Sequence, residues 1–147
     1  DGMAFDRHGN LYVGYRTCPS GSGSIEKFAP GSSQGHVIGM TLSDPQGVAV
    51  DSSGNVVVDE TGTANSRLHR IDVFSPGSKT ASLEVPLPQG NLPIELVIDC
   101  HENTLYVSGL FNVVFGAKYP LPGQSLFVKE QVSAIIQGVT TTNTLAF

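Results

Sequence analysis

The chain of 147 residues carries 8 basic and 13 acidic side chains, which gives a formal net charge of −5, and only 14% of its residues are charged. With 17 glycines and 9 prolines, this composition is typical of an all-β chain rich in turns. It contains no basic cluster of the kind that binds nucleic acids, and no apolar run near the roughly 18 residues that cross a membrane as a helix.

The first unit of the chain begins with two short apolar runs around a polar turn. Gly2–Phe5 and Leu11–Val13 are the runs, and Asp6–Asn10 joins them. An aspartate at the start of such a turn bonds backbone N–H groups two residues on, and Gly9 supplies a position with positive φ. The pattern predicts a β-hairpin. Two more strands are predicted beyond a Ser/Gly-rich loop, at Ser24–Phe28 and His36–Leu42.

The second unit repeats this order of motifs. Gln46–Val58 restates the hairpin, and its runs are apolar at successive positions, which predicts strands that are covered on both faces. The third strand of this unit is predicted at Leu68–Phe74 and the fourth at Ala81–Pro86. Each unit is therefore expected to be a meander of four short strands.

The third unit, which begins its hairpin at Ile94–Val107, departs most from the repeat. Glu102 replaces the turn glycine, so we expect this turn to be built differently or to be strained. Further strands are predicted at Val113–Phe115 and Leu126–Val128. The equivalent positions Gly2, Gly47, Glu95 and Thr144 are 45, 48 and 49 residues apart, which indicates a repeat fold with units at 1–43, 44–90 and 91–142 and the start of another at 143–147.

These units resemble the blades of NHL-type β-propellers. Gly47–Asp51, then Gly54–Val58, then Arg70–Phe74 follow the order of motifs in that family. The resemblance implies an all-β fold of three four-stranded blades, belonging to a ring that commonly has about six blades. We therefore expect both ends of the chain to be cut ends, and the remaining blades to come from a longer chain or from a second copy of this one.

A second resemblance lies at the N-terminus. Asp1 and Gly2, followed by Gly9–Val13, are similar to a segment of gluconolactonase and regucalcin-like propellers, in which this aspartate is catalytic or binds a metal. The Glu and Asn ligands that other blades of that family supply are not matched by motif. This resemblance implies an alternative function, a metal-dependent lactonase-like hydrolase or a lyase, in which the metal polarises a carbonyl and activates water.

Candidate site residues follow from the propeller geometry, because loops entering the first strands and loops leaving the second strands ring the same channel mouth. The candidates are Asp1, Gln46, Asp59, Glu60, Glu95 and Asn143, with Tyr15, Asp44, Asn91 and Ser108 beside them. Grouped carboxylates bind hard cations such as calcium. Asp1 and Glu95 are the candidate metal ligands, Glu95 because it replaces a small residue beside the expected axis. The alternative interpretation is a set of solvated loop acids.

The remaining polar residues favour structural roles. Asp6, Asp51 and Asp99 recur in equivalent turns, where they are expected to cap the backbone. The four histidines are scattered and lack metal-ligand spacing. Cys18 and Cys100 fall in loops at opposite ends of their units, which predicts two free thiols.

No catalytic set is assembled by these motifs. We therefore expect a non-catalytic binding scaffold for a protein, a peptide or a carbohydrate, with the lactonase-like enzyme as the alternative. RNA binding, a third hypothesis for an NHL-type propeller, is disfavoured by the negative charge. The Gly/Ser/Thr-rich and lysine-poor composition favours a secreted or periplasmic protein.

Overall fold

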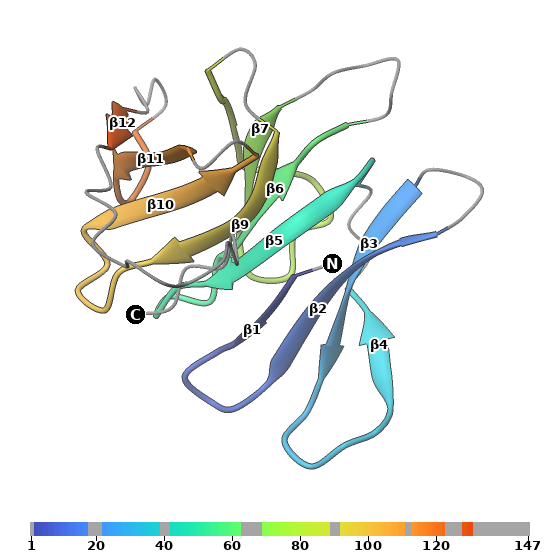
Figure 1. Ribbon diagram of the computed structural model, residues 1–147. Helices are drawn as coiled ribbons and strands as arrows, with labels where there is room; N and C mark the ends of the chain where they lie inside the picture. The colour runs from blue at the N-terminus through green and yellow to red at the C-terminus, as the bar shows by residue number, and fades with distance from the viewer. Residues whose placement is uncertain are drawn as a thin grey trace, which may run out of the picture.

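The computed structural model describes residues 2–17, 22–38, 42–62, 69–88, 92–110, 113–122 and 128–130. In these ranges the chain is all β and contains three four-stranded antiparallel sheets (Figure 1). No helix able to cross a membrane occurs in the described part of the chain. The prediction of an all-β fold is therefore confirmed.

Each sheet takes four strands that are consecutive in the sequence. The first sheet comprises β1 (Met3–Phe5), β2 (Leu11–Thr17), β3 (Ser22–Phe28) and β4 (Gly35–Val37). The second comprises β5 (Pro45–Val50), β6 (Val56–Glu60), β7 (Arg70–Phe74) and β8 (Leu83–Pro86). The third comprises β9 (Pro93–Ile98), β10 (Thr104–Gly109), β11 (Val113–Lys118) and β12 (Val128–Glu130). The predicted four-stranded meanders are thus present in all three units.

The outer strands depart most from the predicted bounds. β4 is shorter than the predicted His36–Leu42, although Leu42 still pairs with Gly23 through an isolated bridge. β12 includes Val128 of the predicted Leu126–Val128, whose first two residues lie outside the described residues. Outer strands have few partners, so their apolar pattern specifies their limits weakly.

The turns of the first two hairpins are capped as predicted. The Asp6 carboxylate accepts hydrogen bonds from the backbone N–H groups of His8 and Asn10, both at 2.9 Å. Asp51 repeats this arrangement in the second sheet. Gly9 and Gly54 have φ of 79° and 84°, whereas Glu102 takes the same role with a φ of 54°. A non-glycine residue with a positive φ carries backbone strain, as predicted for the third turn.

The second sheet lies between the other two. Val56 and Val58 of β6 pack in one core with Tyr12, Ile25 and other residues of the first sheet. Val57, on the other face of β6, packs in a second core with residues of the third sheet, among them Leu96, Leu105 and Val107. The three valines are at most 4% exposed, which confirms that these strands are covered on both faces.

The first strands of the three sheets approach one another closely, which the recurrent glycine explains. A Cβ atom on Gly2 would lie 2.5 Å from the Gln46 carbonyl oxygen, and one on Gly47 would lie 2.6 Å from the Leu96 nitrogen. Only a residue without a side chain lets two backbones meet at such a distance. Glu95 occupies the equivalent position in β9, so the third sheet presents a side chain there.

One face of the first sheet is left uncovered by the described residues. Met3 and Phe5 of β1 are 65% and 68% exposed, and Val37 of β4 is 50% exposed. Met3 and Phe5 alternate along the strand and therefore share a face. This face points away from the second sheet, toward which Tyr12 and Ile25 are directed.

Candidate functional site

The candidate residues of the second sheet lie where β5 begins and β6 ends. Pro45 pairs with Glu60 and Val48 pairs with Val58, so two residues of β5 oppose Asp59 alone. This is a β-bulge, a device that bends a strand and redirects its side chains. An equivalent irregularity occurs at the start of β9, where the pairing shifts between Ser108 and Gly109.

Asp59 is fully buried beside this bulge. Its Oδ1 atom accepts a hydrogen bond from the Gly47 N–H group, while Oδ2 has no partner among the described residues. Burial raises the pKa of Asp59 to about 7; the hydrogen bond from Gly47 opposes this increase and the charge of Glu95 adds to it. Asp59 is therefore a carboxyl group that exchanges its proton near neutral pH.

Glu60 follows Asp59 in the strand and points to the opposite face of the sheet. Its side chain accepts a hydrogen bond of 2.8 Å from the Ser43 N–H group and is 1% exposed. Burial raises the pKa of Glu60 to about 7, and the charge of Asp72 contributes to the increase. Arg70, which pairs with Glu60 across the sheet, forms ion pairs with Asp72 at 2.7 Å and with Glu84 at 3.2 Å.

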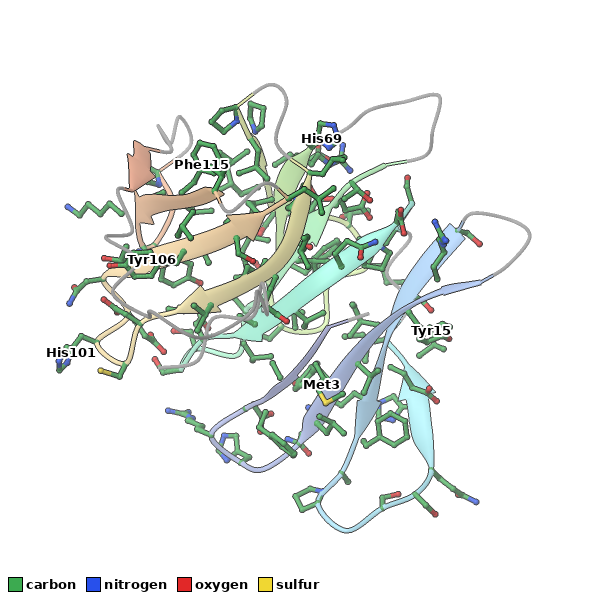
Figure 2. All side chains as sticks on the ribbon, viewed as in Figure 1. Met3, Tyr15, His69, His101, Tyr106 and Phe115 are labelled. Atoms are coloured by element: carbon green, nitrogen blue, oxygen red, sulfur yellow. The ribbon has the colours of Figure 1, made fainter. Side chains whose placement is uncertain are left out.

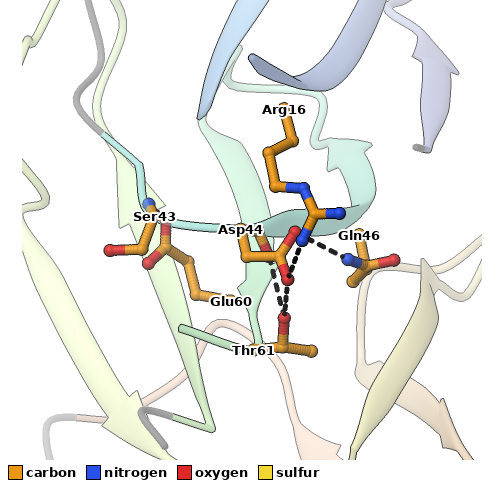
Figure 3. A network of polar contacts seen from close by, with 6 residues as sticks. All are labelled: Arg16, Ser43, Asp44, Gln46, Glu60 and Thr61. Atoms are coloured by element: carbon orange, nitrogen blue, oxygen red, sulfur yellow. Dashed lines mark hydrogen bonds and ion pairs between the residues drawn. The ribbon is translucent and has the colours of Figure 1, made fainter. Parts of the chain in front are cut away.

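Asp44 connects the first and second sheets at this same end (Figure 3). Its carboxylate accepts hydrogen bonds from the Thr61 hydroxyl at 2.8 Å and the Gln46 amide at 3.0 Å, and it pairs with Arg16 at 3.2 Å. Arg16 belongs to β2, so the network joins two sheets. The candidate Gln46 thus donates to a neighbouring loop residue and helps to fix the entry into β5.

Glu95 lies in β9, next to the backbone of Gly47. It is half-buried, and burial raises its pKa. Among the described residues it is the one acid lining a groove of about 480 Å³ along the first strands of the three sheets, whose other walls include Met3, Phe5 and Val97.

The structure brings only part of the predicted site together. Gln46, Asp59 and Glu60 share one end of the second sheet, and the charge of Glu95 reaches Asp59. The side chains of Asp59 and Glu60, however, point to opposite faces of the sheet and lie in two separate environments. Asp1, Asn91 and Asn143 lie outside the described residues. Within the described ranges, no three His, Cys, Asp or Glu side chains are grouped to hold a metal ion.

The other predicted polar residues have simple surroundings. Cys100 is an exposed free thiol, whereas Cys18 lies outside the described residues. His69 and His101 lie far apart in the molecule (Figure 2). The ion pair between the partly exposed Arg70 and the buried Asp72 was not predicted from the sequence. The sequence did carry a signal for this pair, namely two opposite charges at alternate positions of an apolar strand. Such residues share one face of the strand.

Two comparisons with known proteins did not assign the chain to a family. No family model matches the sequence. A search of curated proteins also gave no match. The arrangement of the described side chains is therefore the basis for the function proposed below.

Proposed function

We propose that the chain forms three blades of an NHL-type β-propeller of about six blades and acts as a non-catalytic binding scaffold. The observation that carries this proposal is the arrangement of β1, β5 and β9. Each is the first strand of a four-stranded meander, and Gly2 and Gly47 let neighbouring first strands meet backbone to backbone. Blades arranged around a channel need this crowding at the inner strands.

Binding is favoured over catalysis by what the polar candidates do. Gln46 donates to Asp44, and Asp59 accepts from the bulged backbone of β5, so both stabilise the local fold. The groove along the first strands is lined mainly by apolar residues, among them Met3, Phe5 and Val97. A groove that combines apolar side chains with polar surface suits a peptide segment that offers apolar side chains and backbone hydrogen-bonding groups.

The test is selection of binders from a displayed library of random peptides by the intact protein. We expect enrichment of peptides with apolar residues, and loss of their binding in the variant Val97→Glu. Val97 lines the groove and belongs to neither core, so this change leaves both cores intact. The matched control is Lys79→Glu, on an exposed loop away from the groove. No enrichment, or equal binding by Val97→Glu, contradicts the proposal.

A second candidate function is the metal-dependent lactonase-like hydrolase or lyase, and one observation favours it. The buried Asp59 carboxyl, with one oxygen unpartnered among the described residues, lies within electrostatic reach of Glu95, and both pKa values are raised. Carboxyls tuned in this way suit general acid–base chemistry. Calcium-dependent lactone hydrolysis that is abolished in Glu95→Gln supports this candidate, and unchanged melting with calcium or a chelator argues against it.

A further inference from the structure

A second cavity lies between the first and second sheets, at the ends of the strands opposite to the bulge. It has a volume of about 350 Å³, which is in the range of small-molecule sites. Its walls include Asp6, Tyr12, Lys27 and His36 of the first sheet, and Pro76 and Ser78 from the turn after β7. Both sheets are described there, so the cavity does not depend on whether a ring closes.

The strand register identifies the equivalent space between the second and third sheets. Lys27 pairs with Tyr12 on one side and His36 on the other. Val73 has the same place in the second sheet, since it pairs with Val57 and Leu83. The two junctions between sheets can therefore be compared position by position.

The segments that border the two spaces start from equivalent pairs. Val56 pairs with Phe74, and Leu105 pairs with Ala117. Beyond these pairs the two backbones differ. Tyr119 continues the pairing, with its N–H group bonded to the Asn103 carbonyl, whereas the chain after Phe74 turns at once, with the Ser78 N–H group bonded to the Ser75 carbonyl.

At the second junction this space is filled. Tyr119 and Leu121 are 3% and 8% exposed and belong to a core with Val57, against which Val73 and Leu83 pack. The Tyr119 hydroxyl donates a hydrogen bond of 2.7 Å to Oδ2 of Asp51. A phenol ring thus reaches from the third sheet to the turn aspartate of the second.

At the first junction the space is open, and two equivalent positions of the first sheet hold residues with polar ends. Lys27 replaces Val73 and His36 replaces Leu83, while Pro76 is too short to reach Asp6 as Tyr119 reaches Asp51. An apolar gap of this size would be a defect in the packing. A gap with cationic and hydroxyl groups on its walls is instead suited to a polar ligand.

The charged residues on the cavity walls indicate the sign of the charge on that ligand. The Asp6 carboxylate already accepts hydrogen bonds from the His8 and Asn10 backbone, the Asn10 amide and, at 3.4 Å, the Tyr12 hydroxyl. Lys27 lies 3.9 Å from this carboxylate and 5.0 Å from the centre of the Tyr12 ring. At that distance its ammonium hydrogens are available to an anionic group, with His36 beside it on β4.

We propose that this cavity binds a monosaccharide-sized anionic polyol, a sugar acid or a sugar phosphate. Lys27 and His36 hold the anionic group. A hydroxyl group of the ligand donates to Asp6, as the Tyr119 hydroxyl donates to Asp51 in the equivalent space. The Ser78 hydroxyl, which donates to the Thr80 carbonyl at 2.6 Å, accepts a second hydroxyl group of the ligand.

The experiment is an NMR titration of the intact protein with glucuronate, glucose 6-phosphate, glucose and inorganic phosphate. We expect shifts at Lys27, His36 and Ser78 with glucuronate or glucose 6-phosphate, and whichever binds more tightly identifies a carboxylate or a phosphate as the anionic group. Glucose and inorganic phosphate each lack one of the two features and bind more weakly.

Variants make the test specific. Lys27→Gln is expected to weaken binding about tenfold, whereas Lys79→Gln, which removes the same charge outside the cavity, leaves it unchanged. Pro76→Tyr and Ser78→Leu place the larger residue types of the filled junction on the cavity wall and are expected to abolish binding while the protein stays folded by its melting curve. No binding of any probe, or equal weakening by the two lysine variants, overturns the proposal.

Discussion

Two buried or half-buried aspartates show how surroundings decide the behaviour of one residue type. Burial alone would raise the pKa of Asp6, but hydrogen bonds from Asn10 and His8 and the charge of Lys27 lower it overall. For Asp59, burial outweighs the backbone hydrogen bonds to its carboxylate and raises the pKa to about 7. The two groups therefore couple stability to pH in opposite directions.

The raised pKa of Asp59 predicts that the protein loses stability as pH rises from about 4 to about 7. The unfolded carboxyl ionises near 3.9, so in this window the folded state binds more protons than the unfolded state. Asp59→Asn keeps an acceptor for the Gly47 N–H group and removes the titration. We expect this variant to be more stable than the wild type at pH 8. Its free energy of unfolding should also fall less between pH 5 and pH 8, as measured by urea unfolding.

Asp6→Asn is the matched control, because the pKa of Asp6 is lowered in the folded state whereas that of Asp59 is raised. A carboxyl with a lowered pKa stabilises the folded state above its unfolded value, and that contribution is lost as pH falls through the folded value. Asp6→Asn should therefore lose stability at pH 8. An unchanged pH slope in Asp59→Asn would contradict the assignment of the decline to this residue.

The hydrogen bond from Tyr119 to Asp51 is a second residue-scale determinant of stability. Tyr119→Phe leaves an oxygen of a buried carboxylate with only Asn55 as its side-chain partner. We expect a loss of about 1–3 kcal/mol in the free energy of unfolding. Tyr12→Phe removes a longer bond of 3.4 Å to the equivalent Asp6 and should cost less. Equal losses in both variants would contradict the prediction that the shorter hydrogen bond, from Tyr119 to Asp51, contributes more to stability.

At the scale of elements, the hairpins were predictable because their signals are local. An aspartate three residues before a positive-φ glycine specifies the turn, and the apolar runs on either side specify the strands. The bulge at the start of β5 was not predictable, since it depends on the Asp59 side chain bonding the partner strand. The sequence placed Asp59 at the end of a strand but did not indicate this hydrogen bond to the Gly47 backbone.

The close contact between β5 and β9 predicts that Gly47→Ala is destabilising. The new methyl group would meet the backbone of Leu96 at 2.6 Å and the Asp59 carboxylate at 3.0 Å, so the strands must separate. Overpacking of this kind costs about 1–3 kcal/mol. Thermal unfolding of the variant measures the loss.

Gly35→Ala is the control for Gly47→Ala. Its new methyl group meets the side chains of Phe28 and Glu26 at 2.7 Å, and side chains on a half-exposed face move aside. A loss in Gly35→Ala as large as in Gly47→Ala would mean that the distance alone, and not the backbone contact, sets the cost.

At the scale of the whole molecule, the described residues form three sheets with the second covered on both faces (Figure 1). The continuous apolar runs of β5 and β6 predicted that these strands are covered on both faces. The cavity beside Lys27 and His36 was not predictable, because it depends on which side chains of two sheets meet across a junction. The acids of the proposed channel mouth were expected in one group, yet strand alternation divides Asp59 from Glu60.

The uncovered face of the first sheet, with Met3, Phe5 and Val37, is where the proposed ring would continue. Large exposed apolar faces favour association. The central claim, that these sheets are blades that need further blades beside them, therefore predicts that the polypeptide associates through this face. A charge placed on it should prevent the association without disturbing the two cores.

The most direct test is the mass of the intact polypeptide by light scattering on a sizing column. We predict a dimer of about 31 kDa, twice the 15.5 kDa of one chain, by the closed symmetry common in homo-oligomers. Phe5→Glu should reduce the mass to that of one chain while the protein stays folded. A folded monomer of 15.5 kDa in the unmodified protein, at all concentrations tested, would contradict the account.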